Sequence, residues 1–230
     1  MQRSFDQVQH DVSLQKLPVV IAMDRAGLVG EDGPTHHGPF DLSFLRCIPN
    51  LTVMAPQDEW ELASMLRTAL QIGGPAAIRY PRGPGFGVSL KNPDLIALGK
   101  AKITRPGKDG ALLGIGIMST VARQAADELA KEGLELEVVN ARFVKPLDQE
   151  TIIELLKRHK RILTLEENVR DGGFGSAVME LAEARGVSCQ IKILSLPDEL
   201  IEAGPRNKLL EIYRLDRDGV IQAAREFFVR

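Results

Sequence analysis

The strongest constraint on the fold is the regular alternation of short apolar segments with amphipathic segments between residues 111 and 230. The apolar segments have the length of buried strands, and the amphipathic segments have helical spacing. Predicted strands at 111–118, 136–140, 161–166 and 190–194 alternate with predicted helices at 119–132, 148–159, 174–185 and 216–229. We expect Ser119 to cap the first of these helices and Gly133 to end it. The pattern is typical of a doubly wound, mainly parallel α/β sheet.

Residues 1–82 repeat this pattern, but they open with a helix instead of a strand. Helices are predicted at 2–15 and 57–72, and strands at 19–23, 51–55 and 76–80. Because a parallel unit normally begins with a strand, we expect the first sheet to be incomplete and to expose an edge. Residues 83–110 are rich in Gly and Pro, which indicates a connection between two domains with a short strand near 101–104.

Charge and cysteine content exclude several function classes. The chain has 29 Lys and Arg residues against 31 Asp and Glu, so no basic footprint predicts binding to nucleic acid or to a membrane surface. Its two cysteines, Cys47 and Cys189, lie far apart without a CxxC motif, which argues against a disulfide framework or a zinc ribbon. There is no long apolar run and no signal-peptide pattern, so we expect a soluble, cytoplasmic protein.

The segment 24–39, DRAGLVGEDGPTHHGP, is the first candidate for a functional loop. It follows a predicted strand directly, and ligands of open α/β sheets bind beyond the carboxyl ends of strands. Its Asp32, His36 and His37 are residue types suited to proton transfer. The alternative is that Asp24 and Thr35 cap turns while the histidines face solvent. Adjacent histidines point in different directions, so no metal site is expected.

A second candidate is the RYPRG segment, which places Arg79 and Arg82 at a strand end. Guanidinium groups bind phosphate or carboxylate through two parallel hydrogen bonds. Together with Arg3 and Arg25 they make a phosphate-bearing substrate plausible, although an arginine at a strand end is often an ordinary surface residue.

Two glycine-rich segments are candidate anion sites. Gly114-Ile-Gly116 opens a predicted helix as a dinucleotide fingerprint does, but Ser119 replaces its third glycine. Residues 171–176, DGGFGS, could present backbone N–H groups to an anion or could form a tight turn. Glu166 and Glu167 end a strand, and as neighbours they point to opposite faces, so they cannot work as a paired acid and base. No GxSxG motif supports a nucleophile.

Three strings taken together resemble a known family. QRSFDQVQHDV, DRAGLVGEDGPTHHGPFDLSFLRCIPN and AAIRYPRG are similar to the middle domain of 1-deoxy-D-xylulose-5-phosphate synthases, and TLEEN and GGFGS are similar to their C-terminal domain. The likeness covers essentially the whole chain. It implies two transketolase-type three-layer αβα domains: an incomplete pyrimidine-binding domain at 1–90, a linker at 91–110 and a mainly parallel C-terminal domain at 111–230.

The resemblance also implies a function. These enzymes condense pyruvate with glyceraldehyde 3-phosphate, release carbon dioxide and supply precursors of isoprenoids, thiamine and pyridoxal. They use thiamine diphosphate and Mg²⁺ and form homodimers. Carried over by motif position, His36 would act on protons of the substrate with help from Asp32, while Arg25, Arg82 and Arg3 would bind the substrate phosphate. Of the two histidines, His36 is favoured because it directly follows Thr35 in the DGPTH pattern.

The family pattern is matched only in part. Neither the GDG…N segment that binds the magnesium diphosphate nor the catalytic glutamate and the stacking aromatic residue of these synthases is found, and Phe5 stands where many members have Tyr. The cofactor-binding residues are therefore unknown. We expect part of a synthase, working as a homodimer or with a chain that supplies the other half. The alternatives are a non-catalytic fragment or dimerisation module, and a β-type subunit of a split transketolase or 2-oxoacid dehydrogenase.

Overall fold

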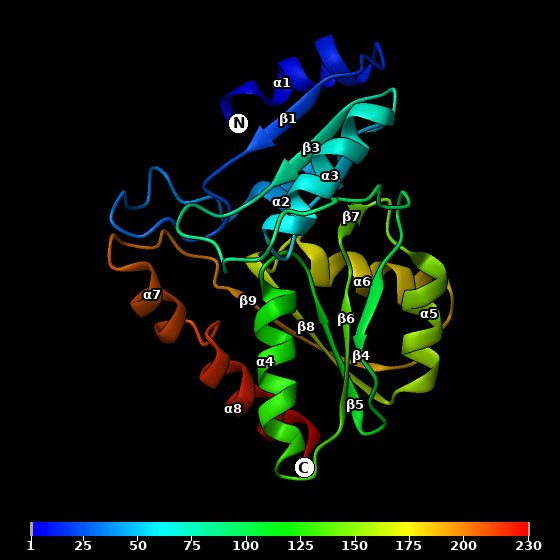
Figure 1. Cartoon of the computed structure of the whole chain (residues 1–230), viewed down its shortest axis with the longest axis vertical. Helices are drawn as coiled ribbons and strands as arrows, with labels where there is room; N and C mark the ends of the chain where they lie inside the picture. Colours follow the sequence, from blue (N-terminus) through cyan, green and yellow to red (C-terminus); the bar gives the residue numbers. More distant parts are fainter. Residues whose placement is uncertain (1, 230) are drawn as a thin grey trace.

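The computed structural model describes residues 2–229, which form two sheets lying one above the other in the view of Figure 1. In the first sheet three strands are parallel and the fourth, which comes from much later in the chain, is antiparallel. Their order is β1 (Val20–Met23), β3 (Ala76–Arg79), β2 (Thr52–Met54) and β7 (Phe143–Lys145).

The second sheet has five strands, all parallel except the edge strand β4. Their order is β4 (Lys102–Arg105), β6 (Leu136–Asn140), β5 (Gly110–Gly114), β8 (Arg161–Val169) and β9 (Gln190–Leu196). Successive side chains of a strand point to opposite faces of the sheet, and both faces of this sheet pack against helices. Leu112 of β5 packs with helices α4 (Met118–Ala130) and α8 (Arg217–Phe228). Its neighbour Leu113 packs with α5 (Gln149–Arg158) and α6 (Phe174–Ala184).

The first sheet is also covered by helices, but less evenly. Met54 and Ile78 pack against α3 (Glu59–Gln71) on one face, and the other face packs against α2 (Asp41–Arg46). The edge strand β1 is only half-buried along most of its length, whereas β2 and β3 are fully buried. The apolar cluster under α2 continues into the second sheet through Leu113. The two sheets therefore share one continuous core.

Before β1 the chain forms short helical turns, η1 (Gln2–Ser4), α1 (Phe5–Gln7) and η2 (Val8–Ser13). Phe5 packs edge-to-face on Phe44 of α2 with 6.3 Å between the ring centroids, which fastens this N-terminal segment to the first sheet's helix layer. Elsewhere, aspartates begin the helices α3, α5 and α8: the side chains of Asp58, Asp148 and Asp216 each accept the backbone N–H three residues on.

The predicted class, an α/β fold with mostly parallel sheets, is confirmed. The short strand expected near 101–104 is β4. Two details differ. α2 and β7 were not predicted, because six and three residues are too short for a periodic signal. The predicted cap at Ser119 is wrong: α4 begins at Met118, and the Ser119 hydroxyl donates to Asn140 Oδ1 instead. The proposed division into domains stays a prediction. None of the helices in residues 2–229 is both long and apolar enough to cross a bilayer.

Candidate functional site

The carboxyl ends of strands from both sheets meet at one place. The narrow space between them is lined by Ala26 after β1, Arg79 and Pro81 at the end of β3, Ile115 after β5, and Glu167 of β8. The loop 24–39 and the segment 80–86 both leave the first sheet here. The site is thus built from loops of the first sheet against strand ends of the second, as expected for ligands of α/β sheets.

Three of the predicted site residues come together on this edge. The carboxylate of Asp32 accepts a hydrogen bond from Arg82 Nη1, and Arg25 Nε lies 3.8 Å from Asp32 Oδ2. Asp32, Arg25 and Arg82 are all partly exposed, so solvent and small ligands can reach them. Arg25 adopts a left-handed backbone conformation, with φ of +62°, that is uncommon for an arginine.

The two adjacent histidines have different environments. His36 is exposed, and its Nδ1 lies 3.0 Å from Thr35 Oγ1. His37 is buried: its Nδ1 accepts the Val29 N–H at 2.9 Å, and its Nε2 lies 3.4 Å from the Glu202 carbonyl oxygen. An acceptor at Nδ1 and a donor at Nε2 describe one neutral tautomer with both nitrogens in use. His37 therefore serves the loop's structure, and only His36 has a ring accessible to a ligand.

The remaining predicted phosphate-binding residue, Arg3, lies in the exposed turn η1. In the described residues the ion pairs of Asp32 are with Arg25 and Arg82, and Arg3 is not among its partners. Arg79, the first arginine of RYPRG, is 5% exposed. It donates to Asp41 Oδ2 at 3.1 Å, to the Gly38 carbonyl at 2.8 Å and to the Glu167 carbonyl at 2.6 Å. The carboxylate that Arg79 binds is thus one of the chain's own.

The same is true of the DGGFGS turn, whose backbone N–H groups hold an internal anion. Phe174 N and Gly175 N donate to the carboxylate of Glu166 at 2.7 and 2.8 Å. Glu166 is fully buried, and this burial raises the pKa of its carboxyl to about 7, against the opposing effect of the two N–H groups. As expected, Glu167 points the other way: it accepts the Leu28 N–H at 2.6 Å and pairs with Arg206 at 2.8 Å.

The glycines of the 114–119 turn also have packing partners within the chain. A side chain at Gly114 would lie 2.7 Å from the backbone of Ser119, and one at Gly116 would approach Ala55 of the first sheet at 3.3 Å. Close approach of the Ser119 backbone explains Gly114, and a left-handed backbone with φ of +62° explains Gly116, without a nucleotide.

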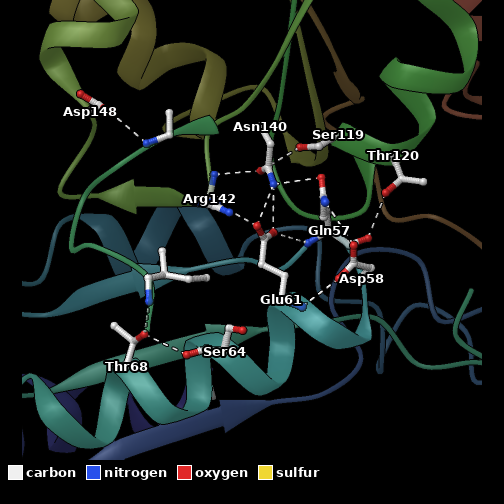
Figure 2. Close-up of polar contacts among 12 residues, drawn as sticks. Gln57, Asp58, Glu61, Ser64, Thr68, Ser119, Thr120, Asn140, Arg142 and Asp148 are labelled. Atoms are coloured by element: carbon white, nitrogen blue, oxygen red, sulfur yellow. Dashed lines mark hydrogen bonds and ion pairs between the residues drawn. The ribbon is translucent and has the colours of Figure 1, made fainter. Parts of the chain in front are cut away.

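A polar network joins the two sheets next to this site (Figure 2). Glu61 of α3 is buried and accepts hydrogen bonds from Gln57 N at 2.8 Å, from Asn140 Nδ2 at 2.9 Å and from Arg142 Nε at 2.7 Å. Asn140 Oδ1 in turn accepts from Ser119 and from Arg142 N. In the sequence Glu61 was recognisable only as an acid in a helix's first turn.

A pocket of about 590 Å³ opens beside the candidate site. It lies between the start of α3, the segment 80–86, the first turn of α4, and α7 (Arg206–Ile212). Its walls are largely apolar, and Arg82 and Arg206 both line it. Sequence reasoning missed Arg206, and it considered Glu167 only as one half of an acid–base pair, since both residues lie far from the predicted loop in the chain and meet it only in the fold.

Comparison with known proteins defines the class of protein first. Residues 1–85 match the transketolase pyrimidine-binding domain, and residues 99–220 match the transketolase C-terminal domain. The chain belongs to the transketolase family. A solved structure of a split-gene transketolase, an inactive β4 tetramer, superposes with a TM-score of 0.85 at 28% identity, covering 99% of this chain and 72% of that one.

Within the family, the sequence is similar to particular enzymes. It is 53% identical to 1-deoxy-D-xylulose-5-phosphate synthase 1 of Geobacter metallireducens over 99% of this chain and 37% of the relative. It is 51% identical to the 1-deoxy-D-xylulose-5-phosphate synthase of Heliobacterium modesticaldum over 98% of this chain and 35% of the relative. The chain therefore spans about a third of the length of the curated relatives it matches.

Proposed function

We propose that this chain is part of a thiamine diphosphate-dependent synthase that condenses pyruvate with glyceraldehyde 3-phosphate to give 1-deoxy-D-xylulose 5-phosphate and carbon dioxide. The observation that carries the proposal is the group formed by Asp32, Arg25 and Arg82, on the loop that also carries the exposed His36, in a chain about half identical to synthases of that name. A cytoplasmic location belongs to the same proposal and is supported by two free cysteines.

In this proposal the two arginines bind the phosphate of glyceraldehyde 3-phosphate. Arg82 is about half exposed and uses one nitrogen on Asp32, so other N–H groups of its guanidinium are free to meet a phosphate. Asp32 fixes the position of both arginines before the substrate arrives, which lowers the ordering cost of binding. Arg3 would contribute from the N-terminal turn, although the structure records no contact between it and Asp32.

His36 is assigned proton transfer to and from substrate oxygens. Its exposure and the contact of Nδ1 with Thr35 leave Nε2 to exchange a proton with a ligand at the site. His37 is excluded from this role by its two internal partners.

Thiamine diphosphate supplies the carbanion chemistry in such an enzyme. In residues 2–229 no group of three or more His, Cys, Asp or Glu side chains is arranged to hold a metal ion. We derive no step through the cofactor. We expect calorimetric titration of this chain with thiamine diphosphate and Mg²⁺ to show no binding. Tight binding would show that this chain holds the cofactor by itself and would overturn the expectation that the other part of the enzyme binds it.

The activity test requires the two thirds of the relatives' length that this chain does not cover. The chain is co-expressed with the portion of the Geobacter metallireducens synthase that precedes the matching region, and release of carbon dioxide from pyruvate is followed with and without glyceraldehyde 3-phosphate. For Arg82→Ala we expect KM for glyceraldehyde 3-phosphate to rise about 10- to 100-fold, because a hydrogen bond to a charged group is lost. KM for pyruvate should hardly change. The exposed Arg217→Ala is the matched control. Equal effects on both substrates would contradict the phosphate assignment.

A second candidate is a β-type subunit that works with a separate partner chain. It is favoured by the structural similarity to the split-gene transketolase, over nearly the whole of this chain. Purification under native conditions from the source cell distinguishes the two candidates: a separate co-purifying chain carrying the cofactor domain supports the subunit, and a single longer polypeptide supports the synthase. Both candidates are compatible with a homodimer of this chain. If neither form shows activity, the non-catalytic module remains.

A further inference from the structure

The loop 24–39, which carries Asp32 and His36, is attached to the second sheet's side of the molecule as well as to the first sheet. Leu28, in the middle of the loop, is fully buried. Its side chain belongs to the apolar cluster that also contains Met118 of α4 and Leu209 of α7. A residue of the first sheet's loop is therefore part of the second sheet's core.

Glu167 of β8 fixes the backbone of this loop at the same point. Its Oε1 accepts the Leu28 N–H at 2.6 Å, and its Oε2 accepts from Arg206 Nη2 at 2.8 Å. The side chain is 4% exposed, and Gly27, with φ of +66°, packs so closely that an added Cβ would lie 2.4 Å from the Glu167 carboxyl carbon. Burial raises the pKa of Glu167, and the positive charge of Arg206 opposes that rise.

The segment leading into α7 holds the loop on either side of Asp32. Gly204 N donates to the Gly30 carbonyl at 3.3 Å, and Gly33 packs against Ala203. His37 Nε2 lies 3.4 Å from the Glu202 carbonyl. Arg206, which pairs with Glu167, directly follows this segment. The loop is thus clamped before and after the residues assigned to chemistry, while Asp32 and His36 themselves stay accessible.

We propose that Glu167 is a positioning residue for the candidate site: together with Arg206 and Leu28 it lets the second sheet set the conformation of the loop that carries Asp32 and His36. The effect of Glu167 on the loop conformation concerns this chain alone, whereas its effect on catalysis rests on the function proposed above. In this role Glu167 acts through the loop, by its contacts with Leu28 N and Arg206.

The test on the isolated chain is hydrogen exchange of Glu167→Gln. A glutamine keeps the size of the side chain but cannot satisfy both Leu28 N–H and Arg206, so we expect amides of residues 26–38 to exchange at least about tenfold faster. The matched control is Glu137→Gln, because Glu137 is equally buried and bound to Arg158 and His159 but lies away from the loop. Unchanged exchange at 26–38, or an equal increase throughout α4, would overturn the proposal.

A second pair of variants keeps the proposal testable if Glu167→Gln folds poorly. Arg206→Ala removes the partner from a partly exposed position and should accelerate the same amides, and Arg206→Lys should restore part of the protection. In the reconstituted enzyme Glu167→Gln should lower kcat with less effect on KM. If amides 26–38 exchange faster in Glu167→Gln but the reconstituted wild type is inactive, this inference stands and the proposed function is overturned. If Glu167→Gln keeps full reconstituted activity and unchanged exchange at 26–38, only this inference is overturned.

Discussion

The two sheets of this chain are enclosed in the same way but contribute differently to the candidate site. In both sheets the central strands are buried, and the edge strands β1, β4 and β9 are partly exposed. The loop after the first sheet's edge strand β1 carries the partly exposed Asp32 group, whereas the second sheet supplies the buried Glu167, which contacts the backbone of that loop. The first region thus supplies accessible candidate residues, and the second region supplies buried contacts to the loop that carries them.

The largest expected effect comes from breaking the network that joins the two regions. Glu61→Ala would leave Arg142 partly buried without its partner, and removing one partner of a buried ion pair costs about 3–5 kcal/mol of the free energy of unfolding. The single tryptophan, Trp60, lies beside Glu61 in α3, so its fluorescence reports on the first region. In urea we expect this fluorescence to change at a lower concentration than the circular dichroism of the whole chain.

The control for that experiment is Glu128→Ala, which removes a surface pair with Lys131 and should cost well under 1 kcal/mol. If the Trp60 fluorescence and the circular dichroism of Glu61→Ala change at the same urea concentration, the two regions unfold together through their shared core. That result would contradict a second region that stays folded when the first unfolds.

A smaller effect is expected from pH, through Glu166. Its pKa in the folded chain is about 7, above the ordinary value of 4.5, so the folded state binds more protons between these values. Stability should therefore rise as pH falls from 8 to 5, and the penalty for burying the charge is present in full above pH 7. Relative to Glu166→Gln, the free energy of unfolding of the wild type should increase by about 2–3 kcal/mol over this range.

The exposed Glu154→Gln serves as the reference and should leave the pH dependence of stability unchanged. A wild-type stability that falls by a similar amount toward pH 5, relative to Glu166→Gln, would mean that the two backbone N–H groups of α6 outweigh the burial of the carboxylate.

The sequence predicted the second region better than the first, for a physical reason. Strands and helices of 111–230 are long and periodic, so burial on both faces leaves a clear pattern. α2 and β7 are too short to do so, and β7 joins the first sheet from a distant part of the chain. The arginine and aspartate types of the candidate site were recognisable, and the position of residues 24–39 after a predicted strand marked them as a candidate functional loop. The contacts of Glu167 with Leu28 and Arg206 were not predictable, because they join residues far apart in sequence.

The smallest effect compares matching helix caps in the two regions. Asp58 begins α3 by accepting the Glu61 N–H at 2.8 Å, and Asp216 begins α8 by accepting the Gly219 N–H at 3.0 Å. Each change to alanine should cost about 1 kcal/mol of the free energy of unfolding. If the second region supports the first but not the reverse, Asp58→Ala should move only the Trp60 transition in urea. Asp216→Ala should move both the Trp60 fluorescence transition and the circular dichroism transition, because a weakened start of α8 loosens the apolar cluster that contains Leu28. A cap in the first region that shifts both transitions equally would show support in both directions.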